Sequence, residues 1–400
     1  MNPGPSRPHA HSRALNPLVG LFALSALTTL DSRAIMVTLP AIATTFGVTP
    51  GVAGYAVTAY AVSFGVLQLA YGPLSDRWGR VTVVRWAGLA FALATLLSGL
   101  APSLGTFVVA RLVTGVFAAA MVSTTFAHIG DTVPYARRHA VVGQFGATLA
   151  TAQVAALSLG GVVAHVATWR LVFEAIGALG LAGFVTLAAR RFDTPAAPPP
   201  PPSLPYLTIL VMPDVWRVCG AVLVEGVFAF GGMTYFAVIA KRRYGVNDLE
   251  AGLLLGCFGA GAALAGLSLR RLAPSLGERR LARLGAFAHA AGWLAFGIGP
   301  TFDGTPAVIA RGMPAVVFSI LGAGWVWLHS TLQTRGTELS AEARGKAFAL
   351  FAVSLFAGLA LGAALLGRLV DGGHVAGATI ACSAGVLAVG LWVGAQRVSG

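Results

Sequence analysis

Three charged residues, Asp31, Arg111 and Glu225, lie inside long apolar stretches of this 400-residue chain. A charged side chain at the centre of a membrane helix costs about 2.5–3.5 kcal/mol on insertion scales, so such residues usually serve a function. A buried carboxyl group can take up and release a proton, and its charge is balanced when a guanidinium lies close by. We therefore take these three residues as candidates for proton coupling.

Asp31 needs a partner, and Arg111 fits better than the neighbouring Arg33. Residues two apart on a helix do not face each other, which argues against Arg33. At about 1.5 Å per residue, Asp31 lies roughly 20 Å from one end of its predicted helix, and Arg111 roughly 6–9 Å from the opposite end of its own. These depths agree in an apolar core about 30 Å thick. The alternative is an ion pair that only neutralises two buried charges.

Two interpretations of Glu225 stay open. It is a second protonatable site or a hook for cationic substrates, or it is a protonated carboxyl group that hydrogen-bonds nearby. Arg311 is a candidate partner, although the two estimated depths differ by several ångströms. Phe117 and Phe228 also lie within apolar stretches. With Arg33 and Arg311 they are candidates for lining a central cavity, whereas aromatic side chains in such stretches more often face lipid or the core.

These residues lie in a chain that composition assigns to the membrane. It is 56% apolar and only 10% charged, with a mean hydropathy of +0.78. A soluble domain is roughly 25% charged, so a soluble enzyme and a secreted disulfide-bonded domain are excluded. A spanning helix takes about 20 apolar residues. We predict an all-α membrane protein with twelve transmembrane helices, near residues 17–40, 52–72, 83–101, 105–128, 140–166, 170–190, 215–240, 249–270, 281–300, 305–332, 346–368 and 374–396.

The basic residues give the expected orientation. The net charge is +13, and most Lys and Arg residues fall in alternate connections on one side of the predicted spans. By the positive-inside rule that side is cytoplasmic, and both termini lie there. Because the positive-inside rule accounts for the positive net charge, we expect no nucleic-acid partner. The short, arginine-rich connections favour a bacterial inner membrane.

The chain divides into two similar halves. A proline-rich stretch at 191–213 follows the sixth span and predicts a semi-rigid cytoplasmic linker. Ala110-Arg111 and Ala310-Arg311 open the fourth and tenth spans at an offset of 200, as expected of an internal repeat. The predicted parts are a cytoplasmic tail at 1–16, a six-helix bundle at 17–190, the linker at 191–213, a second pseudo-symmetric six-helix bundle at 214–396 and a cytoplasmic end at 397–400.

A short motif joins the second and third spans. Residues 72–80 read Gly-Pro-Leu-Ser-Asp-Arg-Trp-Gly-Arg. A hairpin this short needs glycine where backbones approach closely, and Asp76 would suit a helix N-terminus. An ordinary basic loop is the alternative. The motif and the whole arrangement of spans resemble the major facilitator superfamily. The resemblance implies two bundles around a central cavity, alternating access, and a conformational switch formed by Gly72, Asp76, Arg77, Gly79 and Arg80.

In that family the loop aspartate contacts a helix end in the opposite half, which here implies contact between Asp76 and the start of the eleventh helix, near Lys346. Asp31 and the later Leu39-Pro40 resemble the first helix of drug:proton antiporters. Arg111 to Gly115 resembles their fourth-helix motif, whose arginine is linked to proton coupling.

The fifth span departs from the antiporter pattern. Such antiporters carry a Gly-Pro pair where this chain has Ala156-Leu157, but Gly160 and Gly161 are kept and permit close helix packing.

The expected function is export of a small, partly hydrophobic drug or metabolite in exchange for protons. Open alternatives are a symporter or facilitator for a sugar, organic acid or other metabolite, and a non-transporting sensor. No phosphate-binding loop, metal-ligand cluster or nucleophile with a spaced base occurs, so we expect no enzyme activity, metal or cofactor, with the proton gradient as energy source. The expected partners are substrate, protons and lipid, and the expected state is a monomer.

Overall fold

The computed structural model describes residues 17–188, 206–298, 307–339 and 344–396, and almost all of them are helical. In the first half the helices are α1 (Pro17–Phe46), α2 (Pro50–Ala53), α3 (Tyr55–Trp78), α4 (Arg80–Gly99), α5 (Leu104–Thr132), α6 (Tyr135–Val166) and α7 (Trp169–Ala188). In the second they are α8 (Tyr206–Leu210), α9 (Pro213–Glu225), a π-helix η1 (Gly226–Phe230), α10 (Gly231–Met233), α11 (Phe236–Tyr244), α12 (Asp248–Ile298), α13 (Ala307–Glu338), α14 (Arg344–Asp371) and α15 (Val375–Ala395).

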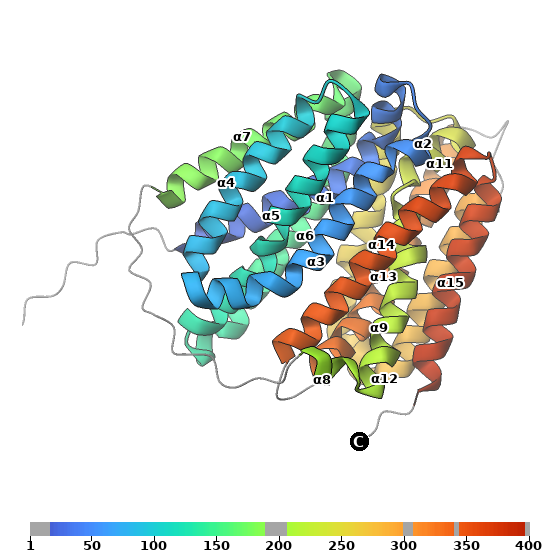
Figure 1. Ribbon diagram of the computed structural model, residues 1–400. Coiled ribbons are helices and arrows are strands. Elements are labelled where there is room, and N and C mark those ends of the chain that lie inside the picture. The colour runs from blue at the N-terminus through green and yellow to red at the C-terminus, as the bar shows by residue number, and fades with distance from the viewer. Residues whose placement is uncertain (1–16, 189–205, 299–306, 340–343, 397–400) are drawn as a thin grey trace, which may run out of the picture.

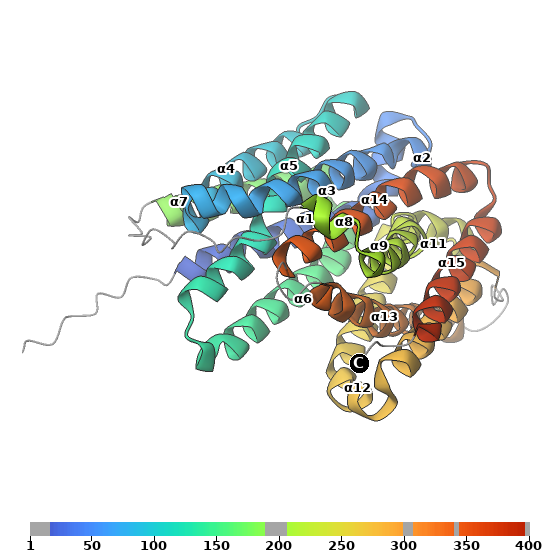
Figure 2. The ribbon, with the colours of Figure 1, turned by 60° about the horizontal axis from the view of Figure 1, so that its bottom comes forward.

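Within these residues, 11 helices are long and apolar enough to cross a membrane, and one of them is α12 with 51 residues. A straight helix of that length would measure about 76 Å, more than twice the apolar thickness of a bilayer. Gly277 breaks it with a φ of 72° and a ψ of 161°. Figure 2 shows the two arms folded back on each other. With the arms as separate crossings, the predicted twelve-helix fold is confirmed.

The seventh span differs from its prediction as one helix over 215–240. It is divided into α9, η1, α10 and α11. Here the chain packs against α14 at the level of its backbone: a Cβ on Gly226 or Gly358 would lie within 2.9 Å of the other residue's Cα. Gly231 meets Gly362 in the same way. This close packing goes with a local change of helix type directly after Glu225.

The helices form two bundles side by side, α1–α7 and α9–α15 (Figure 1). The predicted tail at 1–16, the proline run of the linker and the end at 397–400 lie outside the described residues. The last part of the linker is helical: it forms α8, and the Tyr206 hydroxyl donates to the carbonyl oxygen of Leu69 in α3 at 3.3 Å. Burial raises the pKa of this phenol.

The two bundles meet mainly toward one end of the molecule. We call it the Asp371 end, because Asp371 closes α14 there, and we call the opposite end, where α3 finishes, the Asp76 end. Helix α3 packs along α14, and α6 packs along α12. These contacts run from the Asp371 end to about mid-length, where the Phe64 and Phe356 rings lie 4.2 Å apart. Figure 1 shows the bundles converging at α2 and α11 and spreading toward α8.

Exposed tryptophans gather at the Asp76 end. More than half of the surface of four described tryptophans is exposed, and each lies near a helix terminus at this end: Trp78, Trp86, Trp216 and Trp392.

Candidate functional site

Asp31 and Arg111 form a buried ion pair between α1 and α5. The Arg111 Nη1 atom donates to Asp31 Oδ1 at 2.6 Å, and both side chains are fully buried. The guanidinium carbon also lies 4.7 Å from the ring centre of Tyr60 and 5.3 Å from that of Phe173. The structure therefore brings together the two residues that sequence depth paired.

The pair is incompletely satisfied. Asp31 Oδ2 and Arg111 Nε are both buried without a hydrogen-bond partner in the described structure. Buried polar atoms of this kind are rare and costly, and an unpaired one calls for an explanation. A carboxylate with one bonded and one free oxygen can accept a proton on the free oxygen while the other stays held. The geometry thus offers a place for a proton at Asp31.

Arg33 points toward the second half of the molecule. Its guanidinium carbon lies 5.3 Å from the ring centre of Phe230 in η1. Together with Gln153 of α6 and Trp325 of α13 it lines a small cavity between the halves, of about 10 Å³, whose other walls are apolar. Arg33 thus lies where a cavity residue was expected.

Glu225 has a partner that the sequence analysis did not give it. His329 Nδ1 lies 3.1 Å from both Glu225 carboxylate oxygens. The imidazole stacks on Trp325, with ring centres 5.4 Å apart. The Arg311 side chain lies outside the described residues, and Arg311 precedes His329 by about 27 Å along α13. In the described structure the partner of Glu225 is His329, and the candidate pair with Arg311 falls on a side chain outside the described residues.

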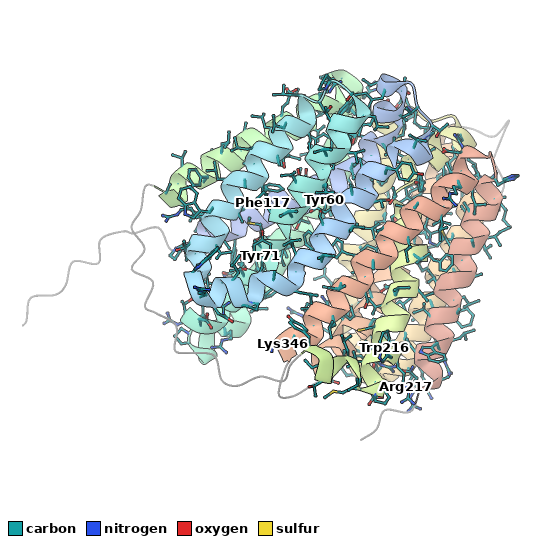
Figure 3. The ribbon with its side chains drawn as sticks, viewed as in Figure 1. Tyr60, Tyr71, Phe117, Trp216, Arg217 and Lys346 are labelled. Atoms are coloured by element: carbon teal, nitrogen blue, oxygen red, sulfur yellow. The ribbon has the colours of Figure 1, made fainter. Side chains whose placement is uncertain are left out.

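The two phenylalanine candidates lie inside their own bundles. Phe117 packs into the core of the first half, beside Phe64, and Figure 3 shows it on the same side as Tyr60. Phe228 lies directly against Gly385 of α15. Neither residue is part of the lining of the small cavity described above, and their expected role in a central cavity stays a prediction. Phe230, two residues after Phe228, is the ring that meets Arg33 across the bundles.

The switch motif has a different local structure from the one expected. Helix α3 continues to Trp78, so Asp76 lies in its last turn and not at a helix N-terminus. The chain turns only at Gly79, whose φ of 87° favours glycine. A Cβ on Gly72 would meet nothing within 4 Å, so no close backbone approach requires glycine there in this conformation. Arg77 is exposed.

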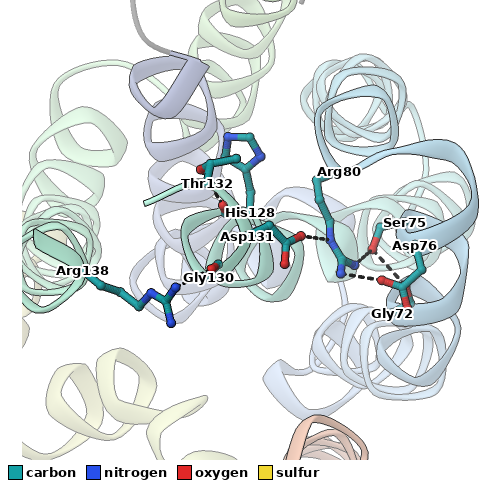
Figure 4. Close-up of polar contacts among 9 residues, drawn as sticks. All are labelled: Gly72, Ser75, Asp76, Arg80, His128, Gly130, Asp131, Thr132 and Arg138. Carbon is teal, nitrogen blue, oxygen red and sulfur yellow. Dashed lines mark hydrogen bonds and ion pairs between the residues drawn. The ribbon is translucent and has the colours of Figure 1, made fainter. Parts of the chain in front are cut away.

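Arg80 is the centre of the polar contacts at this motif (Figure 4). It forms ion pairs with Asp76 and, at 3.0 Å, with Asp131 at the end of α5. It also donates to the Ser75 hydroxyl at 2.5 Å. The expected contact of Asp76 with the start of α14 is thus replaced by a contact within its own half. Lys346, labelled at the start of α14 in Figure 3, lies 5.4 Å from the Tyr206 ring centre.

The two neighbouring glycines of α6, Gly160 and Gly161, differ in how closely they pack against other helices. A Cβ on Gly161 would lie 2.6 Å from the Cα of Gly252 in α12, so the two bundles touch backbone to backbone here. A Cβ on Gly160 would meet its nearest atoms only at 3.9 Å, an ordinary contact. Only Gly161 is required for close packing.

A clasp at the Asp371 end was missed by the sequence analysis. Thr49 donates from its hydroxyl to Asp371 Oδ2 at 2.6 Å, and the Gly51 amide donates to Oδ1 at 2.8 Å. These bonds join α14 to the start of α2, across the two halves. The available signal was a carboxylate at the very end of an apolar span, but its partners lie more than 300 residues away and carry no charge.

No group of three or more His, Cys, Asp or Glu residues suited to a metal ion occurs in the described chain.

A family model described as the Major Facilitator Superfamily matches residues 21–363 of the chain. The chain belongs to the major facilitator superfamily. It is a multi-pass membrane protein, and the predicted family and fold are confirmed.

Similar proteins within the superfamily include transporters and a drug resistance protein. The uncharacterized MFS-type transporter YceJ of Bacillus subtilis (strain 168) is 28% identical over 242 residues, 60% of this chain and 62% of that protein. The puromycin resistance protein pur8 of Streptomyces alboniger is 34% identical over 155 residues, 38% of this chain and 31% of that protein. The chain thus matches less than two thirds of either relative's length.

Solved structures show the same fold. The crystal structure of a D-xylose-proton symporter has a TM-score of 0.73 to this chain at 16% identity, with 94% of this chain and 96% of that chain covered.

Proposed function

We propose that the protein exports a small, partly hydrophobic drug or metabolite in exchange for protons, by alternating access. The observation that carries the proposal is the buried Asp31 carboxylate, bonded to Arg111 through one oxygen and left with a free buried second oxygen. Similarity to a puromycin resistance protein supports a drug-like cargo. The proton gradient is the energy source, and no cofactor takes part.

The proposed orientation places the Asp76 end in the cytoplasm, because the basic connections lie there. The clasp at Asp371 then closes the outer side, and the spreading bundles face inward. The membrane is proposed to be a bacterial inner membrane and the working unit a monomer.

The proposed exchange works through the charge of Asp31. A proton arriving from outside binds Oδ2, neutralises the carboxylate and weakens its ion pair with Arg111. The guanidinium keeps the rings of Tyr60 and Phe173, which stabilise a cation on their faces. Release of the proton inside restores the pair. Cargo and proton bind in states that exclude each other, because otherwise the gradient would leak.

The test uses the purified protein in liposomes with a pH-sensitive dye inside. A proton gradient is imposed, cationic and neutral hydrophobic compounds are added, and the wild type is compared with Asp31→Asn. We expect at least a tenfold loss of compound-dependent proton flux in the variant, since an amide cannot exchange a proton. Asp214→Asn, a carboxylate that is 74% exposed and paired only with Arg217, is the matched control. Equal flux in Asp31→Asn would refute coupling at Asp31, and absence of flux in both would favour a facilitator.

A further inference from the structure

Two residues that line the cavity between the halves, Arg33 and Trp325, carry hydrogen-bond donors for which the described residues supply no acceptor. We propose that it binds the anionic group of an amphiphilic cargo, of the aromatic carboxylate class, with Arg33 and Trp325 as the binding residues. This proposal rests on the proposed transport function and narrows its substrate class. The test below measures binding without a proton gradient, so a failure of the proposed binding site can be distinguished from a failure of the proposed proton exchange.

Arg33 supplies the first donor and the charge. Its guanidinium makes no hydrogen bond or ion pair to any described residue, and its one ring contact is Phe230. Arg111 is already balanced by Asp31. Arg33 therefore has no carboxylate partner among the described residues. Its side chain is partly buried, and an anion placed beside a cation that is partly removed from water would stabilise it.

Trp325 supplies the second donor. Its indole nitrogen, Nε1, is buried without a hydrogen-bond partner, and indole only donates. The Trp325 and Phe230 ring centres lie 5.6 Å apart in an edge-to-face arrangement, so Arg33 and Trp325 flank the same phenylalanine. The Glu225 carboxylate lies against His329, with both oxygens 3.1 Å from Nδ1. Among the described residues, neither Arg33 nor the Trp325 Nε1 atom has a bond to a carboxylate.

The rest of the lining suits an apolar body. Met36, Leu157 and Phe258 are among the walls, and Gln153 is the one uncharged polar amide. The cavity volume of about 10 Å³ is roughly that of one water molecule, so in this conformation it accommodates only a group of that size. The ring system would enter when the bundles part. Two donors, a cation and apolar walls select a carboxylate-bearing aromatic compound over its uncharged analogue.

The experiment is equilibrium dialysis of detergent-purified protein with 2-naphthoate and with 2-naphthamide at pH 7.5, without a membrane gradient. The two probes share the ring and differ in charge. We expect the wild type to bind naphthoate at least tenfold more tightly than naphthamide. Arg33→Gln should remove this preference, Arg33→Lys should keep part of it, and Trp325→Phe should weaken naphthoate binding several-fold. Arg217→Gln, which removes an exposed guanidinium labelled in Figure 3, should change nothing.

Thermal melting of each variant separates lost binding from lost folding, and Arg33→Lys provides a second, conservative variant. Equal affinity for the two probes, no binding of either, or an unchanged preference in folded Arg33→Gln would each overturn the proposal. A naphthoate preference that persists when Asp31→Asn transports protons normally would refute only the proposed exchange.

Discussion

Two buried pairs, Asp31–Arg111 and Glu225–His329, lie one in each half and differ in how completely they are bonded. Both oxygens of Glu225 face the imidazole at 3.1 Å, whereas Asp31 keeps a free Oδ2. A fully satisfied buried pair stabilises its surroundings, and a partly satisfied one can change state at a smaller cost. We therefore assign proton exchange to Asp31 first and regard Glu225 as the stabilising member.

This difference predicts the effect of removing the Glu225 carboxylate. In Glu225→Gln the amide oxygen still accepts a hydrogen bond from His329, and we expect a loss of less than about 1 kcal/mol in the free energy of unfolding. Glu225→Leu removes the partner of an imidazole that is only 15% exposed, and should cost about 1–3 kcal/mol. Thermal melting in detergent measures both. Equal melting temperatures for the two variants would contradict the stabilising role.

Residue depth could be predicted for one pair and not for the other. Asp31 and Arg111 are both charged residues within apolar stretches, which makes them easy to recognise in the sequence. Their estimated depths, calculated from the rise per residue of a helix, agree. His329 offers no such signal, because its imidazole is not necessarily charged and the predicted span stops three residues later, at 332. The helix continues to Glu338, nine residues beyond His329. His329 therefore lies deeper than hydropathy indicated.

Among the elements, α6 and α12 form the closest contact between the bundles at the Asp371 end. Their backbones meet at Gly161 and Gly252, where neither residue has room for a side chain. Glycine at both positions allows the helices to touch, as small residues do in other membrane proteins. The contact belongs to the conformation closed at this end.

Adding one methyl group at this contact should push the two helices apart. In Gly161→Ala the new Cβ meets the Gly252 backbone, so α6 and α12 must separate. We expect a cysteine placed at Leu157, which is buried, to react about tenfold faster with a water-soluble maleimide. The three native cysteines are first replaced.

Gly160→Ala is the matched control, because its methyl group meets only ordinary contacts at 3.9 Å. Its reaction rate should equal that of the parent. The same acceleration in both variants would show that helix propensity, and not the contact with α12, is responsible.

Helix existence could be predicted well and helix joints poorly. Apolar length located every crossing, including both arms of α12, because the lipid core sets that length. The joints depend on single residues and their distant neighbours. Gly79 turns the chain where a loop from residue 72 was expected, and η1 goes with glycines of α14 more than 100 residues later. Such contacts leave no periodic signal in one sequence.

At the scale of the whole molecule, α3 and α14 carry a carboxylate at each end of their shared contact. Asp371 at the end of α14 bonds the start of α2 in the other half, while Asp76 at the end of α3 bonds Arg80 within its own half. One end is clasped and the other is free to change partners. In the proposed alternating-access cycle, the balance between the two arrangements would set which side of the membrane the cavity faces.

Removing the clasp should shift that balance. Asp371→Ala loses the bonds to Thr49 and Gly51, and we expect the population open at this end to rise about tenfold, since a hydrogen bond to a charged group contributes about 1.5–3 kcal/mol before solvent exposure is considered. Spin labels at Tyr55 and His374, both exposed at this end in opposite halves, report the change as a longer distance in pulsed electron resonance.

Asp248→Asn tests whether any lost carboxylate at this end has the same effect. The Asp248 carboxylate pairs with Lys241 at 2.8 Å inside the second half. Its label distances should match those of the wild type. A distance unchanged in Asp371→Ala, or lengthened equally in Asp248→Asn, would argue against the clasp.

The four exposed tryptophans lie at the Asp76 end, so the two ends of the molecule should be anchored in the bilayer to different degrees. Indole rings favour the head-group layer of a bilayer, so the tryptophans should hold the Asp76 end in that layer. The Asp371 end has no comparable set of exposed tryptophans among the described residues. If the two bundles tilt against each other, the Asp76 end should stay at the depth of the head groups. A bilayer that is too thick or too thin would then displace mainly the Asp371 end. We therefore expect lipid chain length to affect the proposed transport cycle independently of substrate and protons.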